Sequence, residues 1–208
     1  MIHCIGNSHV NNFSNHEKLS FESKDSRFKL HHIGPVIAYN FAEHHYHKVD
    51  NIISSIDKTT DWVTLVAGEV DCRLHLPLQA DNQQRSDESI VEECVDRFFV
   101  NYVTLKSAGY NVFCTGTHPT TIEPHDMSRH DRPIYGDVAR RNNICLLWEN
   151  ELKRQCINAD IPFVSVYDHL VDENNITKMD FFIDYCHLNS EKIFEKLILE
   201  LKKHEILK

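Results

Sequence analysis

Short apolar runs that stop abruptly at glycine or aspartate recur along this chain of 208 residues, and they limit its fold more than any other feature. A run of four to six such residues between turn residues is typical of a buried strand. Four runs stand out, at residues 2–5, 62–67, 111–115 and 162–167. The pattern therefore predicts these four as buried strands.

The segments between these runs have helical periodicity. Apolar residues recur every three or four positions from Val91 to Leu105, behind a Ser89-x-x-Glu92 capping box and before Gly109. Three more helices are expected, from Pro35 to about Val49, from an Asp137 cap to Cys156, and from Ser190 to Leu201. Strands that alternate with helices predict a parallel sheet with helices on both faces, a three-layer α/β sandwich.

Composition and charge narrow the class of protein and its partners. With 41% apolar residues and no linker-like stretch, we expect a single domain over residues 1–208. The net charge of −9 argues against a nucleic-acid partner, because a phosphate backbone binds basic surfaces. No segment reaches the ~18 consecutive apolar residues that a membrane span requires. Seven cysteines without CxxC spacing predict reduced thiols and a cytoplasmic location.

Polar residues follow three of the predicted strands, at the point where each strand ends. These stretches cover residues 6–8, 68–71 and 116–118. In an open parallel sheet, ligands bind beyond the carboxyl ends of the strands, which meet at one edge. We therefore expect the functional site at this edge.

Four short motifs, in order along the chain, resemble the conserved blocks of the SGNH (GDSL-like) hydrolases. They are Gly6-Asn7-Ser8-His9, Gly34, Gly68-Glu69-Val70-Asp71 and Asp184-Tyr185-Cys186-His187. Each motif alone occurs by chance in many chains, but together they span nearly the whole sequence. The resemblance implies a flavodoxin-like fold with a central, mostly parallel five-stranded sheet, and chemistry that requires no metal or organic cofactor.

The chemistry of these residues fits a serine hydrolase. A serine hydroxyl becomes a nucleophile only when a base takes its proton, and that base needs a third group to fix its tautomer. Asp184 and His187, three residues apart before the last predicted helix, could supply both. Ser8 would then carry the acyl group. The resemblance implies that the backbone N–H groups of Ser8 and Gly34 bind the oxyanion.

Two positions depart from the family pattern. Asn7 replaces the aspartate of the first block, which we expect to alter only hydrogen bonding behind the serine. Val70 stands where the third block carries an asparagine that donates to the oxyanion. Loss of such a donor costs about 2.7–4 kcal/mol of transition-state stabilisation unless another group replaces it. Arg73 and His118 are the candidate replacements.

The third block also resembles a branch of this family with a GExDxR pattern, matched here by Glu69, Asp71 and Arg73. Members of that branch are associated with polysaccharides, and a Gly-Pro pair follows their second strand, as Gly34-Pro35 does here. Arg73 could pair with Glu69 or Asp71 as a structural ion pair, or bind an anionic substrate group.

The sequence thus predicts a serine esterase that acts on a small-molecule or glycan ester, with an O-acetylated sugar as the expected substrate. Two alternatives remain: an O-acyltransferase, favoured if residues 117–135 form a lid that excludes water, and a non-catalytic glycan-binding or assembly protein. A metal site at His44, His45 and His47 is a weaker hypothesis, because no complete ligand set surrounds them. We expect Cys186 not to be the nucleophile, because adjacency to His187 should point the two side chains apart. The oligomeric state is left open.

Overall fold

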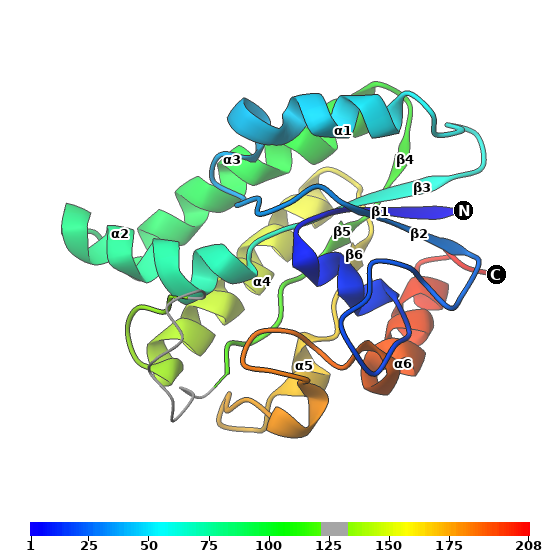
Figure 1. Ribbon diagram of the computed structural model, residues 1–208. Helices are drawn as coiled ribbons and strands as arrows, with labels where there is room; N and C mark the ends of the chain where they lie inside the picture. The colour runs from blue at the N-terminus through cyan, green and yellow to red at the C-terminus, as the bar shows by residue number, and fades with distance from the viewer. Residues whose placement is uncertain (122–132) are drawn as a thin grey trace.

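A parallel sheet lies at the centre of the molecule, in the computed structural model that describes residues 1–121 and 133–208. Its strand order is β2-β1-β3-β4, and every neighbouring pair is parallel (Figure 1). The strands are β1 (Ile2–Gly6), β2 (Phe28–His32), β3 (Trp62–Val66) and β4 (Asn111–Val112). The predicted α/β class with a central parallel sheet is confirmed.

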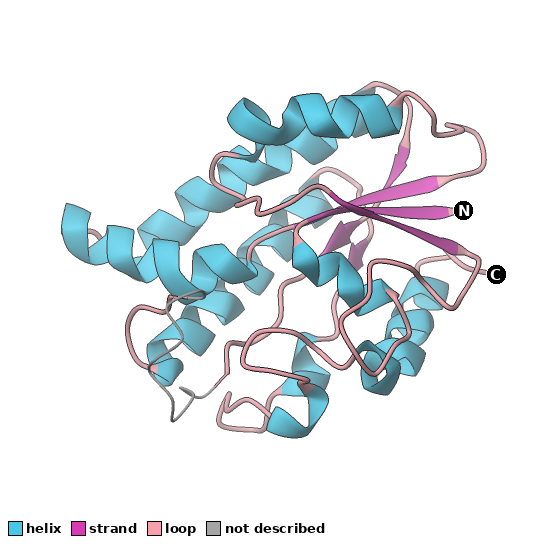
Figure 2. Ribbon diagram, in the orientation of Figure 1, coloured by secondary structure: helices cyan, strands magenta, loops and turns pink. Residues whose placement is uncertain are grey.

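Helices cover both faces of this sheet, so the three predicted layers are present (Figure 2). One face packs against α1 (Tyr46–Ile53), α3 (Asp87–Ser107) and α4 (Val138–Asn158). The other packs against the 3-10 helix η1 (Ser8–Phe13) and α6 (Ser190–Lys203). Shorter elements are α2 (Leu76–Gln83), α5 (Tyr167–Leu170), the π-helical turns Phe41–His45 and Asp71–His75, and the 3-10 turn Met179–Phe181. Over the described ranges, no helix is both long and apolar enough to cross a membrane.

The predicted count of five strands in one sheet is wrong. The central sheet has four strands, and a separate pair is formed by β5 (Cys114–Thr115) and β6 (Phe163–Val164). The reason is a side chain from α3. The Tyr102 hydroxyl donates to the carbonyl of Leu65 at 2.7 Å and accepts from its N–H at 3.1 Å, so it takes the place of a backbone partner from β5, whose Thr115 reaches this carbonyl only with its side-chain hydroxyl, at 3.5 Å. Residues 111–115 therefore pair with β3 only at their start.

Two predicted helix starts differ from the structure. Helix α3 is capped by Ser86, three residues before the expected Ser89, because the Ser86 side chain accepts from the N–H of Ser89. Helix α6 begins at Ser190, as expected, behind an Asn189 cap. Pro35 opens no helix; the chain stays irregular there and becomes helical only at Phe41. The Asp137 cap of α4 is confirmed, with its side chain 2.8 Å from the N–H of Arg140.

Close contact between β1 and β3 fixes where the first strand ends. A Cβ at Gly6 would lie 2.0 Å from the carbonyl oxygen of Val66, which leaves no room for a side chain. Beyond this point the Asn7 N–H donates to the same carbonyl at 3.2 Å, and the chain turns into η1. The glycine thus sets the position of the residues that follow.

We predict that Gly6→Ala destabilises the fold by about 3 kcal/mol, because the added methyl group must push two backbones apart. Gly109→Ala is the matched control. Gly109 has a φ of +88° but no neighbouring atom within 4 Å of an added Cβ, so only the backbone conformation is strained and the expected cost is about 1 kcal/mol. Urea denaturation of both variants measures the difference; equal costs would show that the β1–β3 contact is not tight.

Candidate active site

The site is built at the carboxyl end of β1, where Asn7 organises the turn. The Asn7 side chain caps η1, with its oxygen accepting from the N–H of His9 at 3.0 Å. Its amide nitrogen donates to the carbonyl of Val36 at 3.2 Å, so this buried residue also ties the turn to the segment after β2. Ser8 therefore leaves the strand in a fixed, half-buried position.

Ser8, His187 and Asp184 form a continuous chain of hydrogen bonds. Ser8 Oγ lies 2.9 Å from His187 Nε2, although the two residues are 179 positions apart. His187 Nδ1 lies 2.9 Å from Asp184 Oδ2. A carboxylate only accepts, so the Nδ1 proton points at Asp184 and the Nε2 lone pair faces the serine hydroxyl. This is the arrangement in which an imidazole can remove a serine proton.

The turn before α6 holds His187 through the same aspartate. Asp184 Oδ1 accepts from the backbone N–H groups of Cys186 and His187, each at 2.8 Å. One carboxylate thus shapes the turn with one oxygen and orients the ring with the other. The ring of His187 is buried, whereas the Asp184 side chain is partly exposed.

Cys186 lies closer to His187 than the sequence predicted. Its Sγ is 3.4 Å from His187 Nδ1, so the expectation that the two side chains point apart is wrong. The tight turn made by Asp184 brings both side chains to one side. The thiol is buried, with Sγ 3.4 Å from Nδ1 and 3.9 Å from Nε2, whereas Asp184 Oδ2 and Ser8 Oγ each lie 2.9 Å from one of these two nitrogens.

Gly34 reaches the same edge of the sheet as Ser8. Gly6 pairs with His32 in the parallel register of β1 and β2, so Ser8 and Gly34 each lie two residues beyond a matched pair. Gly34 has a φ of +92°, a conformation that favours glycine. The bond from Asn7 to Val36 holds this segment against the Ser8 turn.

Glu69 and Arg73 form a buried ion pair beside the site. Arg73 Nε donates to Glu69 Oε1 at 2.8 Å, and its Nη1 donates to the carbonyl of Pro133 at 2.6 Å. Burial alone would raise the pKa of Glu69, but His9 and Arg73 together hold it well below its usual range. Of the two roles predicted for Arg73, these contacts favour the structural ion pair.

His118 is held by another histidine, His9, which the sequence analysis did not single out. His118 Nε2 lies 3.0 Å from His9 Nδ1, and His9 Nε2 lies 3.0 Å from Glu69 Oε2. Both suggested replacements for the missing oxyanion donor, Arg73 and His118, are therefore engaged with other groups. The only sign in the sequence that His9 belongs to the site was its position directly after Ser8, the candidate nucleophile.

Asp71 supports the segment after β2 rather than the Ser8 turn. Its buried carboxylate accepts from the backbone N–H groups of Ala38 and Tyr39, at 2.8 and 3.4 Å. Burial raises the pKa of Asp71 to about 6, although these two hydrogen bonds oppose the shift. Its role in this structure is to order the turn that leads into Phe41.

Among the described side chains, one group of three has the atoms of a metal site: Asp184, Cys186 and His187, with ligand atoms within 4.8 Å of one another. Asp184 and His187 are already paired in the chain that ends at Ser8. The side chains of His44 and His45, two of the suggested metal ligands, lie outside the described part of the structure, as do residues 122–132 of the suggested lid.

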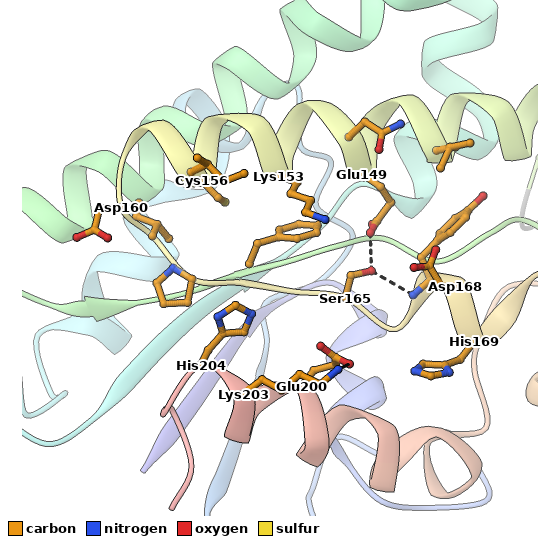
Figure 3. Close-up of a pocket in the computed structure, with 17 residues that line it drawn as sticks. Glu149, Lys153, Cys156, Asp160, Ser165, Asp168, His169, Glu200, Lys203 and His204 are labelled. Carbon is orange, nitrogen blue, oxygen red and sulfur yellow. Dashed lines mark hydrogen bonds and ion pairs between the residues drawn. The ribbon is translucent and has the colours of Figure 1, made fainter.

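A cavity lies away from Ser8, between α4, β6 and α6. It measures about 760 Å³, and Ser8, Asp184 and His187 are not among its lining residues. Figure 3 shows Glu149 pointing from α4 toward Ser165, whose hydroxyl donates to it. Burial raises the pKa of Glu149 to about 8, while the Ser165 hydroxyl and the N–H of Thr117 oppose this shift. The carboxyl group is therefore protonated at neutral pH.

Solved structures that superpose on this fold include esterases and a lipase. A GDSL-like lipase from Bacteroides thetaiotaomicron superposes with a TM-score of 0.62 at 17% identity, over 98% of this chain and 88% of that one. A carbohydrate acetylesterase from Sinorhizobium meliloti gives 0.57 at 11% identity, over 99% of each chain. An aryl esterase from M. smegmatis gives 0.59 at 10% identity, also over 99% of each. No family model matches the sequence, and no curated protein matches it.

We predict that the free energy of unfolding falls by about 2 kcal/mol between pH 6.5 and 8.5 in the wild type, relative to Glu149→Gln. The folded protein keeps the Glu149 proton up to pH 8, whereas the unfolded carboxyl loses it near its ordinary value. The contribution of Glu149 to the free energy of unfolding is therefore complete below the ordinary pKa of a glutamate, and it is lost as the pH rises to about 8. Parallel pH profiles for both proteins would contradict this.

Proposed function

We propose that this protein is a serine esterase of the SGNH (GDSL-like) hydrolase type. The observation that carries the proposal is the unbroken chain from Ser8 Oγ through His187 to Asp184, with both links at 2.9 Å. Each group has the orientation that its role requires. The fold shared with solved esterases and a lipase supports the same assignment.

In the proposed reaction, His187 Nε2 takes the Ser8 proton as Oγ attacks the ester carbonyl carbon. Asp184 stabilises the imidazolium that forms. The tetrahedral oxyanion is bound by the backbone N–H groups of Ser8 and Gly34. The His187 proton then passes to the departing alcohol, which leaves an acyl-serine. Water attacks this intermediate with His187 again as base, and the carboxylic acid is released.

An acylated sugar is the substrate class we favour. The GExDxR pattern of Glu69, Asp71 and Arg73 resembles a polysaccharide-associated branch of the family. One structural neighbour is a carbohydrate acetylesterase, and another is an acetyl xylan esterase. The seven cysteines are free and buried, which supports a reducing compartment such as the cytoplasm.

We predict that a fluorophosphonate probe labels Ser8, and that Ser8→Ala abolishes the labelling and lowers esterase activity by on the order of 10⁴-fold. Mass spectrometry of the adduct locates the modified residue. Ser54→Ala is the control, because Ser54 is exposed and its hydroxyl only donates to the Asn51 carbonyl.

Absence of labelling in folded wild-type protein would overturn the esterase assignment. It would favour the non-catalytic glycan-binding protein, a candidate supported by Val70 at the position of the family asparagine. In that case Ser8→Ala should bind a glycan as well as the wild type does.

Hydrolysis and acyl transfer share the acyl-serine and differ only in what attacks it. We predict that incubation with an acetyl ester and an excess of free sugar releases acetate as the main product. Chromatography of the products measures the partition. A dominant acetylated sugar would instead establish the acyltransferase alternative.

A further inference from the structure

A buried chain of polar groups runs beside the candidate active site, and it includes two histidines that the proposed reaction does not use. It begins at Arg73, whose Nε donates to Glu69 Oε1. It continues from Glu69 Oε2 to His9 Nε2 at 3.0 Å and from His9 Nδ1 to His118 Nε2 at 3.0 Å. It ends at the carbonyl of Pro119, 3.2 Å from His118 Nδ1. Glu69, His9, Arg73 and His118 are all at most 5% exposed.

The number of protons in this chain is constrained by its two ends. A carboxylate and a carbonyl oxygen can only accept, so three consecutive contacts lie between two acceptors. Three hydrogen bonds need three protons, but two neutral imidazole rings carry only two. Burial lowers the pKa of His118 to about 3, and it lowers the pKa of His9 as well, although Glu69 opposes the shift for both rings. At neutral pH the pair of rings therefore holds two protons.

The position of those two protons follows from the ion pair. Arg73 is a permanent cation and keeps Glu69 ionised, so Glu69 must accept from His9 Nε2. His9 Nδ1 is then an acceptor and receives the proton of His118 Nε2. Of the two contacts that His118 makes, only one can carry its proton, and the shorter one, to His9 Nδ1 at 3.0 Å rather than to the Pro119 carbonyl at 3.2 Å, favours His118 Nε2–H. The ion pair thus fixes His9 as the Nε2–H tautomer, and the two distances favour the same tautomer for His118.

His9 is next to Ser8 in the sequence, and its ring lies against that of His187. It directly follows Ser8, and its N–H is held by Asn7. Its ring centre lies 5.1 Å from that of His187, at an interplanar angle of 36°. The titratable groups that face His9 are Glu69, Arg73, His118 and His187.

We propose that His9 is a positioning residue for Ser8 and His187, and that Glu69 fixes its tautomer and orientation as Asp184 does for His187. The site then contains two acid–histidine pairs side by side, one in contact with Ser8 Oγ and one anchoring the residue next to it. This inference rests on the proposed function, because positioning has meaning only if Ser8 reacts.

The substitution Glu69→Gln tests this proposal, because it should reverse which group donates and which accepts in each of the three hydrogen bonds. Arg73 only donates, so the glutamine must turn its oxygen to Arg73 and its NH₂ group to His9 Nε2. His9 must then accept at Nε2 and carry its proton on Nδ1, which donates to His118 Nε2. His118 in turn carries its proton on Nδ1 and donates to Pro119. All three contacts are satisfied with neutral rings.

The experiment is ¹⁵N NMR of the histidine rings at pH 7.5 in the unliganded protein, with signals assigned from His9→Gln and His118→Gln. We expect Nε2–H tautomers for both rings in the wild type and Nδ1–H tautomers for both in Glu69→Gln. The control, His204→Gln, removes an exposed histidine and should leave these signals unchanged. An Nδ1–H tautomer of His9 in the wild type, or no reversal in Glu69→Gln, would overturn the proposal.

The kinetic arm measures the rate of fluorophosphonate labelling at Ser8 and the kcat and KM for p-nitrophenyl acetate. We expect His9→Leu to slow labelling and lower kcat by about 100-fold with KM changed less than threefold, the effect of misplaced reacting groups. In His9→Gln, whose side chain can still donate to Glu69, the labelling rate and kcat should be at least tenfold higher than in His9→Leu. This variant also tests the proposal if His9→Leu does not fold. Wild-type rates in folded His9→Leu would refute the positioning role.

The two arms separate this inference from the proposed function. If wild-type Ser8 is not labelled, the esterase assignment fails, and the positioning role fails with it whatever the tautomers are. If Ser8 is labelled but the tautomers do not reverse, only the inference about His9 fails.

Discussion

The turn after β1 is the constraint on which the rest of the site depends. Gly6 lets β1 approach β3 so closely that no side chain fits, and Asn7 then bonds to both neighbouring segments. This places Ser8 and His9 at the edge where the segments after β2 and β3 also arrive. An error of about 1 Å at this turn would separate Ser8 from His187, a displacement large enough to lower a reaction rate about 100-fold.

The protonation state of a buried acid in this fold depends on whether it has a charged partner. Glu69 is matched with Arg73 and His9, and its pKa stays low because the partners outweigh the effect of burial. Glu149 has hydrogen-bond donors, but the attraction of Lys153 is the smallest of the effects on its pKa, so burial dominates and it keeps a proton at neutral pH. The comparison shows that a cationic partner, rather than depth, decides the state of a buried acid here.

Much of the architecture could be predicted because burial leaves a periodic trace in the sequence. The strand over residues 62–67 and the Asp137 cap are local features, and the structure has them where they were expected. The prediction of a fifth strand in the sheet was wrong because the hydroxyl of Tyr102 bonds to the N–H and the carbonyl of Leu65. From the sequence, Tyr102 looked like an ordinary apolar position of a helix. Periodicity identifies a buried position but gives no information about what its polar atom bonds.

The sequence by itself determined the class of fold, the order of the four motifs, and the residues available for acid–base chemistry. Only the tertiary structure decided which of them meet: Ser8 with His187 across 179 positions, His9 with Glu69 across 60, and His118 with His9 across 109. The physical reason is that these hydrogen bonds depend on sub-ångström placement of side chains from different elements. Local propensity and hydrophobic pattern place elements only to within a residue or two.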